Sequence, residues 1–309
     1  MARTYRPLDG VLLFDKPLEL SSNIALQKVR RLFQAEKAGH TGTLDPLATG
    51  LLPICFGEAT KFSVALLDAD KTYRALVRLG QTTTTADAEG EIIAEYPVEC
   101  HLAGVEAVLE KFRGEIQQLP PMHSALKHQG KPLYEYIRKG EIIERELRDV
   151  VIHELLLHRF EGCELDISVR CSKGTYIRTL AEDIGAALGC GAHLIGLRRT
   201  AIAHFNLSDG FTLQQFSDMS DEQREACVLP LETLMPNMPK LYLDDVQVKR
   251  LAQGQRLALD TGLPDGKIFL HGTDGFIGTG LLQGRRLAPD RLLSRVAKQA
   301  AMPNTENVA

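Results

Sequence analysis

The chain has 309 residues, 44% of them hydrophobic and 25% charged, and its formal net charge is −4. A chain of this length can form about two domains with a substantial core, and the composition is typical of soluble globular proteins. The sequence carries no apolar run of the ~18 residues that span a bilayer and no signal-peptide pattern. These features exclude a membrane-spanning helix and favour a cytoplasmic location.

The amino-terminal part of the chain predicts a strand followed by a helix. GVLLFDKP (10–17) is typical of a short buried strand, and SSNIALQKVRRLF (21–33) of an amphipathic helix. Its apolar residues recur near the helical period at Ile24, Val29, Leu32 and Phe33. Ser21 or Ser22 can cap this helix at its start.

The next segment, GHTGTLDPLATG (39–50), places one acidic side chain among glycines, threonines and small apolar residues. Asp45 followed by Pro46 is typical of a type I turn, because the carboxylate can accept a backbone N–H and the proline fixes φ. A carboxylate in such a loop can also act as a nucleophile or general base. The local residues leave both interpretations open.

Further along, strands and helices alternate without a regular βαβ repeat, which predicts an α+β fold. KTYRALVRLG (71–80) and ELDISVRCS (164–172) alternate apolar and polar residues, as half-buried strands do. Helical spacing that ends at a glycine occurs in LAGVEAVLEKFRG (102–114), PLYEYIRKG (132–140) and TYIRTLAEDIGAALG (175–189).

The proline-rich segment VLPLETLMPNMPKL (228–241) predicts a domain boundary. Beyond it, short apolar runs separated by glycines and Asp-Gly turns predict a small β-barrel. We therefore expect a first domain over residues 1–235, a second over 240–300 and a disordered tail over 301–309. Basic residues outnumber acidic ones ten to six over residues 240–298 and five to two over 170–200, as on a phosphate-binding face.

Cysteine and histidine spacing argues against a metal site. The six cysteines form no CxxC pair, which indicates reduced thiols. HELLLH (153–158) resembles a zinc-binding helix, but its histidines are five residues apart. That spacing directs the two imidazoles apart on a helix and to opposite faces on a strand. We expect no metal.

Asp45, Tyr73 and Arg178 each lie among glycines or threonines next to a predicted strand, where loops can carry function. The chain has neither GxxxxGK[ST] nor GxSxG, so catalysis would rest on a carboxylate, an arginine and aromatic rings. An arginine can hold a carboxylate ionised, and rings can stack on an extruded base. An ordinary strand tyrosine and a surface arginine remain alternative interpretations.

Five blocks occur in the order and spacing of a known family. AGHTGTLDPLATGLLPICFGEATKFS (38–63) and CSKGTYIRTLAEDIGAALGCGAHLIGLRRTAIAHF (171–205) are the longest, accompanied by DKPLELSSN, KTYRALVRLG and PPMHSALKHQGKPLYEYIRKG. Over residues 9–235 the chain resembles the TruB family of pseudouridine synthases, especially its bacterial, tRNA-modifying members. The resemblance implies a catalytic domain with a mixed, largely antiparallel sheet flanked by helices, followed by a PUA-like RNA-binding β-barrel.

The resemblance also implies isomerisation of uridine to pseudouridine at position 55 in the T-loop of tRNA, by base flipping and without cofactor or metal. It identifies Asp45 as the essential aspartate, Arg178 as its partner and Tyr73 as the ring that stacks on the flipped uracil. His40 would fill the space left by the base, and two further residues would contact the target nucleotide, namely Tyr176 and Leu197. Whether the aspartate attacks covalently or removes a ribose proton to give a glycal stays open.

The matching blocks contain six basic residues that we expect to contact phosphates: Lys16, Lys127, Lys131, Arg138, Arg198 and Arg199. Three positions depart from the family pattern. Glu19 stands where glycine is usual, and a positive φ there would strain it. His123 stands where an aromatic residue often precedes the Ser-Ala pair, and Thr43 stands where small residues are common.

The expected partner is the T-arm stem-loop of tRNA, bound by a monomer. Two other functions remain open, namely a tRNA-binding or folding protein with incidental catalysis and a guide-RNA-dependent relative in the same family. The intact set of Asp45, Tyr73 and Arg178 favours an enzyme, since a binding protein has no need of a carboxylate facing RNA. The modest net charge and the bacterial-type blocks favour an enzyme that works without a guide.

Overall fold

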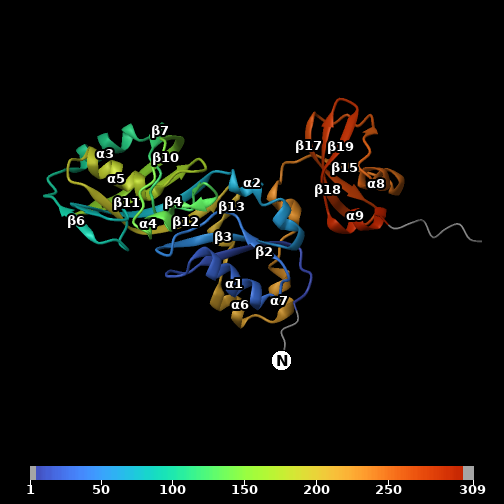
Figure 1. Ribbon diagram of the computed structural model, residues 1–309, viewed down its shortest axis with the longest axis horizontal. Helices are drawn as coiled ribbons and strands as arrows, with labels where there is room; N and C mark the ends of the chain where they lie inside the picture. Colours follow the sequence, from blue (N-terminus) through green and yellow to red (C-terminus); the bar gives the residue numbers. More distant parts are fainter. Residues whose placement is uncertain (1–4, 302–309) are drawn as a thin grey trace, which may run out of the picture.

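The chain folds around two β-sheets that lie side by side along the long axis of the molecule (Figure 1). The computed structural model describes residues 5–301, and within this range the larger sheet has ten strands and the smaller one five. The strands of the larger sheet come from the part of the chain between β1 and β14, and four strands of that part form two separate hairpins. The smaller sheet begins at β15, residues Lys240–Tyr242.

The larger sheet has the order β14-β1-β3-β12-β4-β11-β10-β7, with β2 paired to β3 and β13 to β12. Its pairs are antiparallel except β1 with β14 and β3 with β12. This confirms the predicted α+β class with a mixed, largely antiparallel sheet. The strands are β1 Gly10–Lys16, β2 Ala38–His40, β3 Ala48–Phe56, β4 Lys71–Leu79, β7 Gly114–Gln118, β10 Arg148–Glu161, β11 Glu164–Cys171, β12 Ala192–Ile202, β13 Phe205–Asn206 and β14 Phe211–Thr212.

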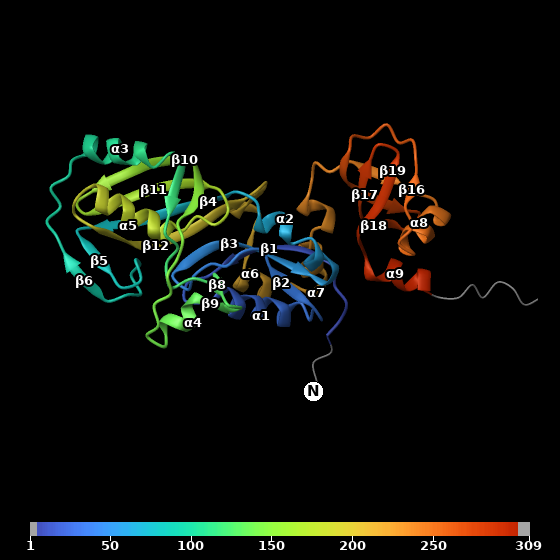
Figure 2. The same cartoon turned by 45° about the horizontal axis from the view of Figure 1, so that its top comes forward.

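Helices cover opposite faces of the two halves of this sheet (Figure 2). Helices α3 (Leu102–Lys111) and α5 (Ile177–Ala187) pack on the half with β4, β10 and β11, where Leu180 joins a buried apolar cluster. Helices α1 (Ser22–Leu32), α6 (Leu213–Asp218) and α7 (Asp221–Ala226) accompany the half with β1 and β3.

The amino-terminal helix is capped as predicted, but its buried face differs from the expected one. The Ile24 N–H donates to the Ser21 hydroxyl at the N-cap. Ala25, Leu26 and Val29 are buried against the sheet, whereas Ile24 is 50% exposed. The small Ala25 thus takes the core position that the apolar pattern assigned to Ile24.

Two short hairpins extend from the larger sheet. One pairs β5 (Gln81–Thr83) with β6 (Ile92–Glu95), and the other pairs β8 (Lys127–His128) with β9 (Lys131–Pro132). Helix α4 follows the second hairpin, and three short helical turns and α2 complete this part: α4 Leu133–Ile137, η1 Gly57–Lys61, α2 Val64–Leu67, η2 Leu207–Asp209 and η3 Leu231–Leu234.

The smaller sheet has the order β15-β17-β18-β19-β16 and curls into a half-barrel, which agrees with the predicted small PUA-like barrel. Its further elements are β16 Leu257–Ala258, β17 Gly266–Gly272, β18 Gly275–Gln283, β19 Arg286–Leu292, α8 Asp245–Ala252 and α9 Ser294–Ala301. The predicted tail over 301–309 lies outside the described residues except Ala301, which ends α9. The predicted domain bounds stay a prediction.

A polar contact joins the two sheets. The Glu58 carboxylate accepts from the Ser294 N–H at 2.7 Å and from its hydroxyl at 3.0 Å. Lys61 pairs with Glu58 at 2.8 Å and donates to the Leu292 carbonyl at 3.2 Å. Because Glu58 thus binds the first turn of α9, the half-barrel is anchored directly to the larger sheet's η1 segment.

Candidate active site

Asp45 lies in a turn that is tied to the amino-terminal helix. The Ala48 N–H donates to the Asp45 carbonyl at 3.0 Å, which closes the β-turn predicted around Pro46. The buried Ser22 hydroxyl donates to the Leu44 carbonyl at 2.9 Å and accepts from the Leu44 N–H at 2.7 Å. The residue before Asp45 is therefore fixed by both of its backbone polar groups.

The adjoining loop contains the strained residue expected from the sequence. Glu19 has φ 66°, a left-handed conformation that a non-glycine residue adopts at an energetic cost. Its N–H donates to the Pro46 carbonyl at 3.0 Å. The glycine-to-glutamate departure thus leaves the loop in a glycine-like conformation in contact with the Asp45 turn.

Arg178 connects two carboxylates in a buried cluster. Its side chain is 7% exposed, with Nη2 3.1 Å from Asp45 Oδ2 and Nη1 3.4 Å from Asp87 Oδ2. It also donates to the His123 carbonyl at 2.7 Å and to the Thr85 carbonyl at 3.3 Å. Arg178 lies in the first turn of α5, where the helix dipole disfavours a cation. The two carboxylates offset that effect.

Burial and neighbouring charges act on the Asp45 carboxyl in opposite directions. Loss of surrounding water raises its pKa above the ordinary 3.8, the Arg178 guanidinium lowers the pKa, and the Asp87 carboxylate raises it again. The Asp45 side chain is still 39% exposed. The site therefore holds a carboxylate that is more basic than usual, paired with a cation and open to a ligand.

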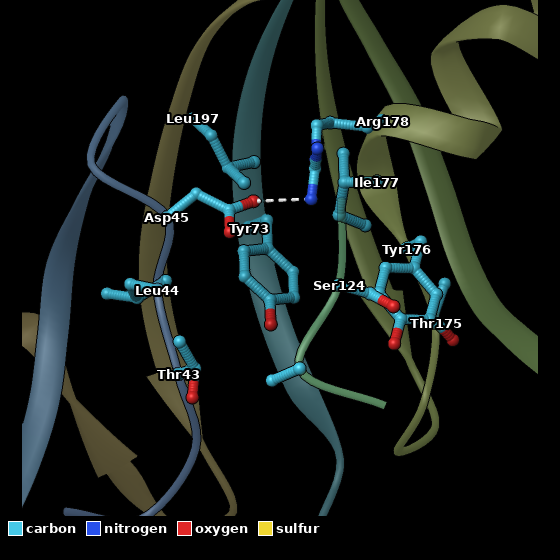
Figure 3. A pocket seen from close by; sticks show the side chains of 11 residues that line it. Thr43, Leu44, Asp45, Tyr73, Ser124, Thr175, Tyr176, Ile177, Arg178 and Leu197 are labelled. Carbon is cyan, nitrogen blue, oxygen red and sulfur yellow. Dashed lines mark ion pairs between the residues drawn. The ribbon is translucent and has the colours of Figure 1, made fainter. Parts of the chain in front are cut away.

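A cavity of about 180 Å³ surrounds Asp45 and Arg178. Figure 3 shows these two side chains pointing toward each other, with the Tyr73 ring beside them and Tyr176 across the cavity. The lining residues are Thr43, Leu44, Asp45, Tyr73, Ser124, Ala125, Thr175, Tyr176, Ile177, Arg178 and Leu197. Five of the six residues expected to form the site, all but His40, thus meet in one pocket.

The pocket is assembled from the middle of the larger sheet. Tyr73 lies on β4 and Leu197 on the adjacent β12, while Tyr176 is the N-cap residue of α5. Burial raises the pKa of the Tyr73 hydroxyl, and the Arg199 guanidinium opposes this shift. The tyrosine hydroxyl therefore stays protonated at neutral pH, and its ring provides an apolar surface for stacking.

Two of the six predicted phosphate contacts are buried, so that prediction is wrong for them. Arg199 is 1% exposed and donates to the carbonyls of Leu51 at 2.8 Å and Gly42 at 3.1 Å. Lys16 is 0% exposed, its amine donates to two backbone carbonyls, and burial lowers its pKa to about 8. Both cations hold loops around the pocket and cannot reach a phosphate at the surface.

The other four candidates lie at the surface. Lys127, Lys131 and Arg138 are exposed on the β8–β9 hairpin and just after α4. Arg198 is exposed on β12, where it pairs with Asp15 at 2.6 Å. These four positions are accessible to a polyanion, and their role as phosphate contacts stays a prediction.

His40 lies on β2 and is not among the residues that line the pocket. Burial lowers the pKa of its imidazole, and the nearby Arg199 lowers it further, so the ring is neutral at pH 7. Its Nδ1 atom is buried without a hydrogen-bond partner in residues 5–301. The role expected for His40 stays a prediction.

Sequence reasoning missed Asp87, whose side chain is 3% exposed and binds Arg178. Its Oδ1 accepts from the Thr85 hydroxyl at 2.5 Å and from the Glu89 N–H at 3.1 Å. In the sequence this residue belongs to TADAEG, which is typical of an exposed turn. A buried arginine needs acidic partners, so the burial of Arg178 points to a second carboxylate. That burial is visible only in the folded structure.

The sequence led us to expect no metal site, both from the cysteine spacing and from the HELLLH segment. Within the described part of the chain, no group of three or more histidine, cysteine, aspartate or glutamate side chains has the geometry to hold a metal ion. His153, from the HELLLH segment, instead lies 3.1 Å from Asp70, and His158 contacts the Ser168 hydroxyl at 2.7 Å.

No helix among residues 5–301 is long and apolar enough to cross a membrane.

Comparisons with known proteins identify the family of this chain. A model of the TruB family pseudouridylate synthase N-terminal domain matches residues 30–177. The chain is 54% identical over 299 residues to tRNA pseudouridine synthase B of Methylobacillus flagellatus, covering 96% of this chain and 99% of that one. The chain belongs to the TruB family. Carboxy-terminal TruB models match residues 178–236 and 239–293.

Other TruB relatives and solved structures support this membership. tRNA pseudouridine synthase B of Cupriavidus pinatubonensis is 57% identical over 266 residues, which are 84% of either chain. A chain in the crystal structure of a Cbf5-Nop10-Gar1 complex is 26% identical, with a TM-score of 0.68 over 92% of this chain and 84% of that chain. The TruB fold therefore extends across both sheets.

Proposed function

We propose that this protein is a bacterial tRNA pseudouridine-55 synthase, which isomerises the uridine at position 55 in the T-loop of tRNA. The observation that carries the proposal is the Asp45–Arg178 ion pair of 3.1 Å inside a pocket walled by tyrosine rings. The curated relatives named tRNA pseudouridine synthase B, which align over almost the whole chain, support the same substrate class.

The pocket suits a base that has left its stack. The reaction breaks the N1–C1′ bond of uridine and forms a C5–C1′ bond, while C5 loses a proton and N1 gains one. Tyr73, Tyr176 and Leu197 present stacking surfaces around the cavity, which offset the few kcal/mol that base extrusion costs. Asp45 then faces the sugar and base as nucleophile or proton acceptor.

Arg178 keeps Asp45 in the charged form that either route needs. A polyanionic substrate raises the pKa of a nearby carboxyl, and an adjacent guanidinium lowers it. Since Arg178 is held by carbonyls as well as by Asp87, its position is fixed before RNA binds. This preorganised charge is the form of electrostatic support that is most effective in a site shielded from water.

The remaining assignments follow the family resemblance. We propose that the protein acts in the cytoplasm as a monomer, with no cofactor or metal, and that residues 240–300 form an RNA-binding domain beside a catalytic domain over 1–235. Exposed Lys127, Lys131 and Arg138 provide a basic surface for the T-arm backbone. Unchanged turnover in EDTA and a monomer mass by light scattering are the expected results.

The direct test is release of tritium from a T-arm stem-loop that carries [5-³H]uridine at position 55. Purified protein alone should release tritium to water and convert that uridine, and a stem-loop labelled at a different uridine is the control. Release only after addition of a guide RNA would favour the guide-dependent relative. Tight T-arm binding without any release would favour the tRNA-folding function.

A further inference from the structure

Gln118 is a buried amide that the proposed chemistry does not use. It ends β7, lies opposite Arg148 of β10, and is 1% exposed. Its side chain binds both backbone polar groups of Tyr176: Nε2 donates to the Tyr176 carbonyl at 3.2 Å, and the Tyr176 N–H donates to Oε1 at 2.9 Å. The amide thus binds Tyr176 as a neighbouring β-strand residue would.

Tyr176 depends on this support because it occupies the N-cap of α5. Serine, threonine, aspartate and asparagine are preferred there, since their side chains accept a hydrogen bond from the first turn. Tyr176 makes no such side-chain bond within the described residues, and its ring lies in the pocket instead (Figure 3). The hydrogen bonds from Gln118 therefore anchor a helix start that has an unfavourable capping residue.

The same helix start carries the charged partner of Asp45. Arg178 lies two residues beyond Tyr176, and its Nη2 donates to the carbonyl of His123, in the segment that follows Gln118 along the chain. Gln118 therefore joins the end of β7 to the first turn of α5 at a single point. A shift of the Tyr176 peptide would move the Tyr176 ring and Arg178 together.

We propose that Gln118 is a positioning residue that fixes the Tyr176 backbone, and through it the Tyr176 ring and Arg178, relative to Asp45. The inference rests on the proposed function, because it concerns the same pocket. The amide offers a neutral donor and acceptor side by side, matching the carbonyl and N–H of one residue. Methionine and leucine lack both strong groups.

The test compares two adjacent glutamines of β7. Gln118→Met removes both hydrogen bonds at similar side-chain length. Gln117→Met is the matched control, because the Gln117 amide binds Asp149 on the exposed side of the sheet. With tritium release from the T-arm, we expect kcat of Gln118→Met to fall about 10²-fold, the size of effect seen for small misalignments. KM should change less than about threefold, since phosphate contacts supply most affinity.

Two further measurements separate positioning from a general loss of structure. Amide exchange should become faster at Tyr176 in Gln118→Met, while protection in the middle of α5 is kept. Should that variant fail to fold, Gln118→Leu also removes both the donor and the acceptor in a smaller side chain, and kcat is again expected to fall. Native kcat in either folded variant overturns the inference, as does a loss confined to KM. No release by the unsubstituted protein and by Gln117→Met would instead contradict the proposed function.

Discussion

The pocket and the basic segment of residues 127–138, which contains the β8–β9 hairpin and α4, use the same kinds of charged residue in two different ways. The buried Arg178 in the pocket binds two carboxylates and two carbonyls. In the basic segment, Lys127 and Lys131 are exposed, and Arg138 lies over the Tyr134 ring at 5.3 Å. Buried charges with fixed partners suit the reaction itself, whereas exposed cations suit binding of a mobile polyanion.

Apart from the loss of the Asp45 carboxylate itself, the largest effect is expected for Arg178→Lys. An ammonium keeps the charge but cannot bridge Asp45 and Asp87 with a planar fork. We expect kcat to fall about 10²- to 10³-fold, as when one preorganised electrostatic group is removed, with T-arm affinity nearly unchanged. Single-turnover tritium release and filter binding measure the two quantities. Arg170→Lys, at an exposed strand position, is the control. Equal losses of kcat in both variants would contradict a special role for the buried arginine.

The basic segment of residues 127–138 should show the opposite behaviour. Replacing Lys127, Lys131 and Arg138 together by glutamine should raise Kd for the T-arm about tenfold and lower the salt slope of log Kd by about 2, because each phosphate contact contributes about 0.7 to 0.9. At saturating RNA, kcat should stay native. A matched triple variant removes three exposed cations of α1 and α3: Lys28, Arg31 and Lys111. A salt slope equally reduced in that control would argue against a specific basic surface.

The pH profile tests the electrostatics of the pocket. Activity needs ionised Asp45, and burial raises its pKa above 3.8 despite the opposing Arg178 charge. As pH falls through that raised pKa the carboxylate is protonated, so kcat/KM should decline at a higher pH than an ordinary aspartate would produce. Values of kcat/KM at fixed ionic strength between pH 4.5 and 8 measure this acidic decline. A kcat/KM that is constant down to about pH 4.5 would contradict a raised pKa for Asp45.

The smallest effect is expected for Glu19→Gly. Relief of the left-handed conformation at φ 66° should raise the free energy of unfolding by up to about 1 kcal/mol, equivalent to about 2 °C in Tm. Differential scanning calorimetry measures the change. Leu18→Gly, at the preceding exposed position, should lower Tm. A lower Tm for Glu19→Gly would show that the glutamate side chain itself stabilises the loop.

Much of the fold was readable from the sequence where a local rule decides it. Alternating residues predicted β4 and β11, and glycine predicted the end of α5, where Gly189 has φ 79°. The Asp45–Pro46 turn was also local. These features depend on the conformational preferences of a few neighbouring residues, so tertiary packing leaves them intact.

Features that depend on which face is buried were harder to predict. Arg198 and Arg199 are adjacent on β12 and must face opposite sides, but the sequence does not say which one enters the core. The structure buries Arg199 and exposes Arg198. Asp87 was missed for a related reason, because its partner Arg178 lies 91 positions away in the sequence. Only assembly of the sheet brings them together.

The most direct test of the central claim uses Asp45→Asn, which keeps the size of the side chain but removes both its charge and its nucleophilic oxygen. We predict no tritium release from the position-55 T-arm above background at saturating enzyme. The T-arm Kd should stay within about tenfold of native, because backbone contacts supply most of the affinity. Release at the native rate by the folded Asn variant would contradict the assignment of Asp45 as the reacting carboxylate.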